Sequence, residues 1–488
     1  MDINEILQQE NPQDVINALK SGRNKELPDI DLAEKALNPE KHDINDPTKR
    51  KDKWVAVDKK ENGQIDDSEK VIDTQDGETQ MRIEKVARVR LALQKLIIKR
   101  AVAFLFGNEV AYNADVTNPQ EEMIMNAFKK IISDSKSNSI NRKVARAVFG
   151  YKECAELWYP VEMPVKSNKL GFPCKFKLRC AVFSPAFGDT LYPFFDDLGD
   201  LIAFSREYSI KNSEGINVQY FETYTDTERY LWQKDGNEYR LLEGFPKKIA
   251  IEKIPVVYAR QDEFETQDVD SLIDRLELLL SNFADTNDYH ASPKIFTTGT
   301  INSWSKKGEA GAVIEGEEGA TMQYVSWQNA PESVKLEIET LLRMIYTLTQ
   351  TPDISFESVK GLGAISGIAL KLLFMDAHLK VQDKREIFDE YLQRRANIIK
   401  AYIGDFNHQL KETCENMEIE PEITPYMLTN ELDELTYWLT ANGGKAVISQ
   451  EEAVEKIGIS KNPKATYEKL KEEESRNNSF VISEPVEA

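Results

Sequence analysis

The amino-acid sequence predicts an α+β fold, and three observations predict it. Apolar residues recur at helical spacing over residues 84–149. Short runs of β-branched and aromatic residues then follow one another over 156–258. Long helical patterns cover 269–289, 331–349 and 366–410. Helices that flank a set of strands, instead of alternating with them, are typical of a mostly antiparallel α+β architecture.

Composition sets the broad class. A chain of 488 residues is too long for one simple core and predicts two to four structural regions. Hydrophobic residues make up 41% and charged residues 30%, and 21 Phe, 18 Tyr and 6 Trp supply enough core material to argue against a disordered chain. The formal net charge is −21, whereas proteins that grip nucleic acid are usually basic. If such a chain contacts DNA, it does so through local basic groups, or it encloses the DNA without binding it tightly.

The first 150 residues are expected to be helical or irregular. Residues 1–83 are polar and predict short helices, such as one over 12–19, with a flexible segment over 43–76. Three helices are predicted next, over 84–106, 119–133 and 138–149, and Gly107 with Asn108 is a typical helix stop.

The middle of the chain changes to a β pattern. Asp235-Gly236 is a hairpin-turn signal between two of the predicted strands. The strands are predicted at 156–161, 175–183, 201–210, 218–225, 228–233, 239–242 and 254–258.

A strong helical pattern follows at 269–289, and Pro293 forbids its simple continuation. One face is apolar and the other is acidic. The acidic face carries Asp270, Asp274, Glu277, Asp285 and Asp288. Residues 294–327 predict a compact β insertion with strands at 295–298, 311–314 and 322–325, and a helix returns over 331–349.

The last third begins with a loop over 350–364 that is rich in Pro and Gly. It leads into the longest helical pattern, 366–410, which Gly404 is expected to bend or interrupt. Shorter helices are predicted at 429–440, 449–457 and 464–475, where Ser449 and Glu452 make a capping box. The last dozen residues predict a disordered tail.

Catalytic fingerprints are absent from the sequence. It contains no P-loop, no G-x-G-x-x-G and no G-x-S-x-G motif. The four cysteines match no zinc pattern and are expected to be buried reduced thiols; they are Cys154, Cys174, Cys180 and Cys414. We therefore expect neither a metal nor a cofactor. We also expect no signal peptide, because residues 1–10 are polar, and no membrane span, because charged residues interrupt the most apolar stretch at 91–106.

The order of the parts and four short motifs resemble the portal proteins of tailed bacteriophages of the siphovirus type. The run from Thr351-Pro352-Asp353 to Gly363-Ala364-Ile365-Ser366-Gly367-Ile368-Ala369-Leu370-Lys371 resembles the family's T-P-D … G-x-x-S-G-x-A-L-K. Phe104-Leu105-Phe106-Gly107-Asn108-Glu109-Val110 resembles its L-F-G-x-P-V, with Glu109 in place of the usual proline. Ile254-Pro255-Val256-Val257 resembles its I-P-V-V, and Ile448-Ser449-Gln450-Glu451-Glu452 its I-S-x-E-T. The resemblance spans about 84–475.

The resemblance implies a portal-type fold with named parts. These are an α/β wing at 1–266, of which 1–83 are flexible and 84–266 are α+β; a stem of two helices at 267–290 and 331–350; a β-rich clip at 291–330; a tunnel loop at 351–364; a long helix at 365–411; an α-helical crown at 412–475; and a disordered tail at 476–488.

The resemblance also implies a function without enzymatic activity. Twelve copies would form a ring-shaped DNA channel at one capsid vertex of the virion, used in genome packaging, head–tail joining and DNA ejection, after assembly in the host cytoplasm. The implied partners are the large terminase subunit, a head–tail adaptor, the major capsid and scaffolding proteins, and double-stranded DNA. The implied DNA contacts are the tunnel-loop residues Ser355, Glu357, Lys360, Gly361 and Gly363. The implied docking residues of the clip are Lys306, Lys307, Glu309 and Glu315.

A ring would multiply each charge that faces its lumen. The acidic face of 268–290 would then repel DNA and let it slide, while Lys360 would add one weak cationic ring. Plain solvation of the acidic face and an ordinary loop lysine stay open as alternatives. So do two other functions: a phage scaffold or adaptor that binds proteins through its helices, and a metal-dependent nuclease that uses acidic clusters.

Overall fold

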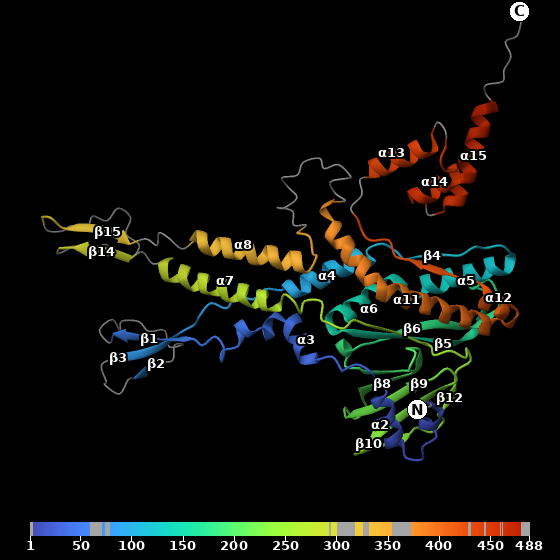
Figure 1. Cartoon of the computed structure of the whole chain (residues 1–488), viewed down its shortest axis with the longest axis horizontal. Coiled ribbons are helices and arrows are strands. Elements are labelled where there is room, and N and C mark those ends of the chain that lie inside the picture. The colour runs from blue at the N-terminus through green and yellow to red at the C-terminus, as the bar shows by residue number, and fades with distance from the viewer. Residues whose placement is uncertain are drawn as a thin grey trace, which may run out of the picture. The chain divides into compact units, whose positions relative to one another are not determined.

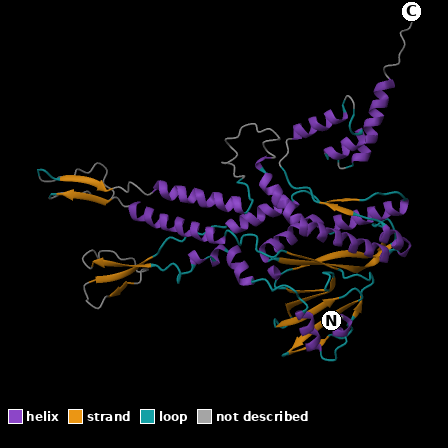
Figure 2. Cartoon of the chain, viewed as in Figure 1, coloured by secondary structure: helices purple, strands orange, loops and turns teal. Residues whose placement is uncertain are grey.

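The computed structural model describes residues 3–58, 71–73, 79–291, 294–299, 318–325, 331–353, 372–427, 431–443, 446–458, 460 and 462–479 (Figure 1). The chain forms two compact units. The first comprises Met1–Pro352 and Ala377–Pro425, and the second comprises Asp353–Asp376 and Tyr426–Ala488. Helices and strands both contribute to the first unit (Figure 2), which confirms the predicted α+β class.

The elements up to residue 151 are mostly helical. They are α1 (Ile3–Leu7), α2 (Pro12–Ser21), α3 (Ile30–Leu37), η1 (Pro39–Lys41), η2 (Asp43–Asn45), β1 (Lys53–Asp58), β2 (Val71–Asp73), β3 (Thr79–Glu84), α4 (Leu93–Phe106), β4 (Ala111–Asn113), α5 (Pro119–Asp134) and α6 (Ser137–Tyr151).

The β-rich middle of the chain forms two antiparallel sheets. Its elements are β5 (Glu153–Ser167), β6 (Cys174–Phe183), η4 (Pro185–Phe187), β7 (Thr190–Phe195), β8 (Leu201–Lys211), β9 (Asn217–Tyr224), β10 (Glu228–Asp235), β11 (Glu238–Leu241), β12 (Lys247–Lys248) and β13 (Val256–Arg260). One sheet has the order β11-β10-β9-β8-β7, with β12 on β10, and the other has the order β13-β5-β6. The predicted turn at Asp235-Gly236 joins β10 to β11, with Gly236 at a φ of 65°.

The rest of the first unit consists of α7 (Asp270–Ala291), β14 (Lys294–Thr298), β15 (Thr321–Val325), α8 (Pro331–Leu348), α11 (Met375–Phe406), η5 (His408–Leu410), α12 (Lys411–Asn416) and β16 (Glu420–Glu422). In α11, the residues from Ala377 onward belong to this unit. β14 pairs with β15, as the predicted β insertion requires, while its third predicted strand at 311–314 lies outside the described residues. β16 pairs with β4.

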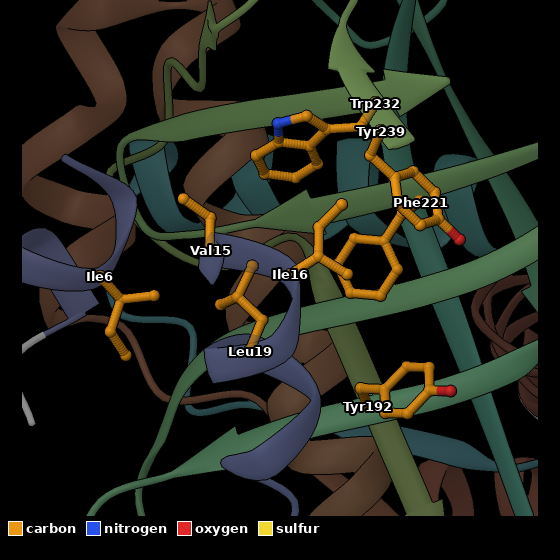
Figure 3. Close-up of a cluster of buried hydrophobic side chains, with 8 residues drawn as sticks. All are labelled: Ile6, Val15, Ile16, Leu19, Tyr192, Phe221, Trp232 and Tyr239. Carbon is orange, nitrogen blue, oxygen red and sulfur yellow. The ribbon is translucent and has the colours of Figure 1, made fainter. Parts of the chain in front are cut away.

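The N-terminal segment packs closely against the larger sheet, although the sequence predicts a flexible part over residues 1–83. Val15, Ile16 and Leu19 of α2 point toward aromatic rings of the sheet (Figure 3), and all three are at most 3% exposed. The segment 43–76 was also predicted to be flexible, but it contains η2, β1 and β2.

The predicted helix over 84–106 starts nine residues late. Its first turns are replaced by an irregular, non-helical segment at 85–92, and α4 begins only at Leu93. The described part of α11 runs through Gly404 to Phe406, so this glycine does not interrupt the helix. A Cβ at Gly404 would lie 3.2 Å from Cα of Lys411, so a larger residue would require the following segment to shift by a few tenths of an ångström.

A buried ion pair attaches α11 to the smaller sheet. Arg395 Nε lies 2.6 Å from Oε1 of Glu156, and Arg395 Nη2 lies 2.8 Å from Oε2, with both side chains fully buried. Trp158 Nε1 donates to the same carboxylate at 2.9 Å. Removing one partner of such a pair leaves an uncompensated buried charge, which typically costs about 3–5 kcal/mol. The pair therefore holds α11 in a defined position against β5.

The second unit contains α13 (Glu431–Asn442), α14 (Gln450–Ile457) and α15 (Pro463–Ser479). Ser449 caps α14, and the predicted capping box with Glu452 is confirmed. α14 lies against α15, and Gln450 Nε2 donates to Glu474 at 3.2 Å. α15 extends to Ser479 and so includes four residues of the predicted disordered tail; the remainder of that tail lies outside the described residues.

Candidate functional site on the helix pair α7 and α8

α7 and α8 form an antiparallel pair, in which the chain runs out along α7, turns through β14 and β15, and returns along α8 (Figure 1). An apolar cluster lies between the helices and includes Ile273 and Leu276 of α7 and Ile345 of α8. Arg275 Nη2 also lies 2.7 Å from the carboxylate of Glu337. The helical apolar stripes predicted from the sequence therefore meet each other, because each helix buries the stripe that it cannot leave in water.

The predicted acidic face of α7 is divided in the structure. Asp274 and Asp288 are exposed, whereas Glu277 is fully buried and Asp285 and Asp270 are half-buried. Burial raises the pKa of Asp270, and Gln94 Nε2 donates to it at 3.4 Å. Other segments of the same chain form hydrogen bonds with the carboxylates of Glu277 and Asp285. Only part of the predicted face is therefore open to solvent within one copy.

The segment 85–92 is attached to α7 through its backbone. The amide of Ala87 donates to Asp285 Oδ1 at 2.7 Å. The amide of Val89 donates to Ser281 Oγ at 2.9 Å, and that of Leu91 donates to Glu277 Oε1 at 2.6 Å. Alternate amides of the segment therefore bind every fourth residue of the helix, in the opposite chain direction.

The two spacings agree for a geometric reason. Two residues of extended chain advance by about 6.6 Å. Four residues of an α-helix advance by about 6.0 Å. An extended segment can therefore follow the side chains of one helical stripe over several residues without losing register. This pairing explains why the apolar spacing of Val86, Val89 and Leu93, which looks helical, does not produce a helix there.

Two more groups from the N-terminal segment reach the same stripe of α7. Arg50 Nη2 lies 2.7 Å from Asp285 Oδ2. His42 Nδ1 lies 2.7 Å from Glu277 Oε1, and its Nε2 lies 3.2 Å from the carbonyl oxygen of Ala36. Both imidazole nitrogens thus face oxygen acceptors, an arrangement that the protonated ring satisfies. Burial opposes the charge of the ring, but the hydrogen bond and charge of Glu277 outweigh it, and the pKa of His42 is raised.

The start of the predicted tunnel loop is anchored. Lys380 Nζ donates to the carbonyl oxygen of Thr349 at 2.7 Å and lies 2.5 Å from Oε1 of Glu265. Arg100 Nη1 donates to the carbonyl oxygen of Pro352 at 2.8 Å. Burial lowers the pKa of Lys380. Cations from α4 and α11 therefore fix the backbone directly before residue 354.

Two groups of predicted site residues lie outside the described part of the chain. The first is the tunnel-loop set of Ser355, Glu357, Lys360, Gly361 and Gly363, and the second is the clip set of Lys306, Lys307, Glu309 and Glu315. Sequence reasoning missed His42, Arg50 and the segment 85–92, because no motif marks them and more than 180 residues separate them from α7. The four cysteines are free thiols; three are buried and Cys180 is half-buried.

Over the described ranges, no three His, Cys, Asp or Glu side chains gather as a metal site would require. Among the same residues, no helix has both the length and the apolar character needed to cross a membrane.

One protein family matches almost the whole chain. The family model described as phage portal protein, SPP1 Gp6-like, matches residues 16–479. No curated protein matches the chain significantly. Solved structures that resemble it include a chain from the neck of an empty gene transfer agent particle, at 10% identity and a TM-score of 0.38, covering 75% of this chain and 89% of that one. Another, from the virion of a native gene transfer agent particle, has 10% identity and a TM-score of 0.35, covering 75% and 88%.

Proposed function

We propose, from the premise that this chain belongs to the SPP1 Gp6-like family of phage portal proteins, that copies of it assemble into the ring-shaped DNA channel of a capsid vertex. The family match over residues 16–479 is the observation that carries the proposal. The role is structural and involves no catalysis. The ring serves genome packaging, head–tail joining and DNA ejection.

The parts of the subunit take the roles that the family implies. The wing is 1–266, α7 and α8 form the stem, β14 and β15 belong to the clip, and 351–364 form the tunnel loop. The proposed partners are the large terminase subunit and the head–tail adaptor at the clip, the major capsid and scaffolding proteins around the ring, and double-stranded DNA in the lumen. Of the acidic face predicted on α7, Asp274 and Asp288 are the residues that are exposed in one copy, and they fit a DNA-repelling lumen.

Electron microscopy of the purified full chain, together with its mass in solution, tests the ring. We expect closed rings with a mass near twelve times 55.8 kDa. A protein that is monomeric or dimeric at every concentration and salt condition contradicts the proposal.

The tunnel loop has its own test. Replacing Gly361 and Gly363 by Val restricts the backbone of the loop, because glycine alone reaches many conformations without strain. We expect the double variant to form normal rings but to package much less DNA in an in vitro packaging assay. Normal packaging by this variant would refute the assigned role of the loop.

The clip is tested by deletion. A chain without residues 300–320 is expected to form rings that no longer bind terminase or adaptor in a pull-down experiment. If such rings still bind both partners, the docking surface lies elsewhere.

A further inference from the structure

A basic groove of about 820 Å³ opens on the first unit, between α3, α4, α6 and η4. Five cationic side chains line it: Lys95, Lys99, Arg142, Lys143 and Arg146. All five are exposed, and within the described part of the chain none of them forms an ion pair. Such a concentration of unpaired positive charge is unexpected on a chain with a net charge of −21 and points to an anionic occupant.

The groove also offers apolar surface. Ile98 and Ala147 lie at its floor, and Phe187 is 51% exposed at its edge with Lys143 Nζ 4.6 Å from the centre of its ring. Its one acidic lining residue, Glu34, is already paired with Lys41. A phosphodiester backbone has no use for such a floor, whereas an acidic helix with an apolar side chain matches both the charge and the apolar surface.

α11 carries a stripe of that composition on its surface. Leu379, Asp383, Glu386 and Glu390 follow one another at intervals of four, three and four residues, so they share one helix face. Leu379 is 53% exposed, and the three acidic residues are exposed as well. Two cations lie near the stripe. Lys384 is held by Glu265 at 3.0 Å and also lies 3.7 Å from Asp383. Arg394 lies near Glu390, but its Nε donates to the carbonyl oxygen of Val256 at 3.3 Å. The stripe therefore keeps most of its negative charge.

The groove and the stripe lie on different sides of α6. Asn141 Oδ1 of α6 accepts a hydrogen bond from Arg395 of α11, and the ring of Phe149 packs edge-on against that of Phe388. At about 100° per residue, Lys143 and Arg146 point about 160° and 140° away from Asn141, whereas Arg142 lies between these directions. Two complementary surfaces on different sides of one subunit are what a head-to-tail contact in a closed ring requires.

We infer that the basic groove of one copy receives the α11 stripe of the next copy around the ring. The inference rests on the proposed function, because only a ring or filament needs a repeated head-to-tail contact. Five cations then neutralise three carboxylates from the neighbour, and Leu379 reaches the apolar floor beside Phe187. The contact relieves the mutual repulsion of strongly acidic subunits at one defined place.

Charge reversal in the full chain tests the contact. The groove variant carries Lys95→Glu, Arg142→Glu and Arg146→Glu, and the stripe variant carries Asp383→Lys, Glu386→Lys and Glu390→Lys. The matched control carries Lys166→Glu, Lys169→Glu and Lys177→Glu, three exposed lysines on β5 and β6 and the loop between them, and it makes the same change in charge as the groove variant. The measurements are the ring fraction by mass photometry and the folded state by circular dichroism.

We expect each variant alone to remain folded and to lower the ring fraction at least tenfold. An equimolar mixture of the two variants should also recover rings, because alternating copies pair the reversed groove with the reversed stripe and the wild-type groove with the wild-type stripe. One chain with both sets of changes should recover the rings as well, and the control should keep them. If the wild type and the groove variant both form intact rings, the contact is refuted, but the proposed portal function is not. A failure of the combined variant to recover overturns α11 as the occupant.

DNA is the other anionic molecule that could occupy the groove, and a gel shift with a 30-base-pair duplex tests it. A groove variant that keeps its rings but loses DNA binding identifies the groove as a nucleic-acid site and overturns the inference. Wild-type protein that never forms rings contradicts the proposed function itself.

Discussion

His42 and Glu277 form a buried pair whose members are 235 positions apart in the sequence. Glu277 Oε1 accepts from both His42 and the amide of Leu91, so one carboxylate holds two separate segments on α7. The sequence places Glu277 correctly on the polar face of a helix. It gives no means of distinguishing this residue from Asp274, one turn earlier, because the distinction depends on segments that arrive from elsewhere.

The stability of the protein should depend on the ionisation of His42. Its pKa is raised in the folded chain, so the stabilisation is fully present below the unfolded value of about 6.5 and is lost as pH rises through the folded value. We expect His42→Gln to lower the melting temperature most near pH 6. The difference from wild type should shrink toward pH 9, as measured by differential scanning fluorimetry.

A matched control exists for this measurement. His408 is exposed, and His408→Gln should leave the melting temperature unchanged at each pH. Taking differences between variants at one pH removes the contributions of Asp274 and the other acidic groups near the pair. A wild-type advantage that grows with pH would show that His42 is neutral in the folded protein.

The segment 85–92 shows, at the level of elements, where pattern reasoning succeeds and where it stops. α5, α7 and α8, and the strands from β8 to β11, begin and end within a few residues of their predicted positions, because each buries a stripe that its own sequence displays. Residues 85–92 instead satisfy their amides on side chains of α7. Nothing in the sequence of residues 84–93 indicates that partner, so their apolar spacing predicts a helix that does not form.

The pairing with α7 predicts an alternating pattern of amide protection over residues 87–91. The amides of Ala87, Val89 and Leu91 donate to α7 and should exchange slowly with solvent deuterium. Ser281→Ala removes the acceptor of Val89. It should speed exchange at that amide and lower stability by about 1–3 kcal/mol, the cost of an unsatisfied buried donor.

Ser271 provides the control, because it is exposed on the same helix. Ser271→Ala should leave the exchange of the Val89 amide unchanged and should alter the free energy of unfolding by no more than about 0.5 kcal/mol. Hydrogen exchange resolved to single residues by mass spectrometry measures both. Equal effects of the two substitutions would contradict the pairing.

For the whole molecule, one predicted boundary differs from the division of the chain into compact units. The last helical region was expected to begin at 412, yet the first unit continues to Pro425. β16 pairs with β4, and Gln393 Nε2 of α11 donates to the carbonyl oxygen of Ile419 at 3.1 Å. Pairing between strands some 300 residues apart leaves no local signal in the sequence. The change in composition near 412 therefore predicts a boundary that the compact unit does not have.

Truncation measures this boundary. A chain that ends at 425 should keep the main unfolding transition of the full chain to within about 2 °C, a shift that corresponds to roughly 1 kcal/mol or less. A chain that ends at 410 loses the buried side chains of Cys414, Met417, Ile419 and Ile423. At about 1.5–3 kcal/mol for each large apolar residue, it should melt many degrees lower or fail to fold. Similar melting of the two truncated chains would return the boundary to 412.

The docking of residues 85–92 on α7 also bears on how this protein can change over evolutionary time. The three amides bind α7 without help from their own side chains, so positions 87 and 89 are free to vary among nearly all residue types, whereas Leu91 also packs against the apolar cluster between α7 and α8 and should stay apolar. Proline alone is excluded there, since it has no amide hydrogen to donate. Conservation should instead be found in the helix, as hydrogen-bond acceptors at positions 277, 281 and 285. Among distant relatives, we expect a signature spaced by four residues on one side of the contact and almost none on the other.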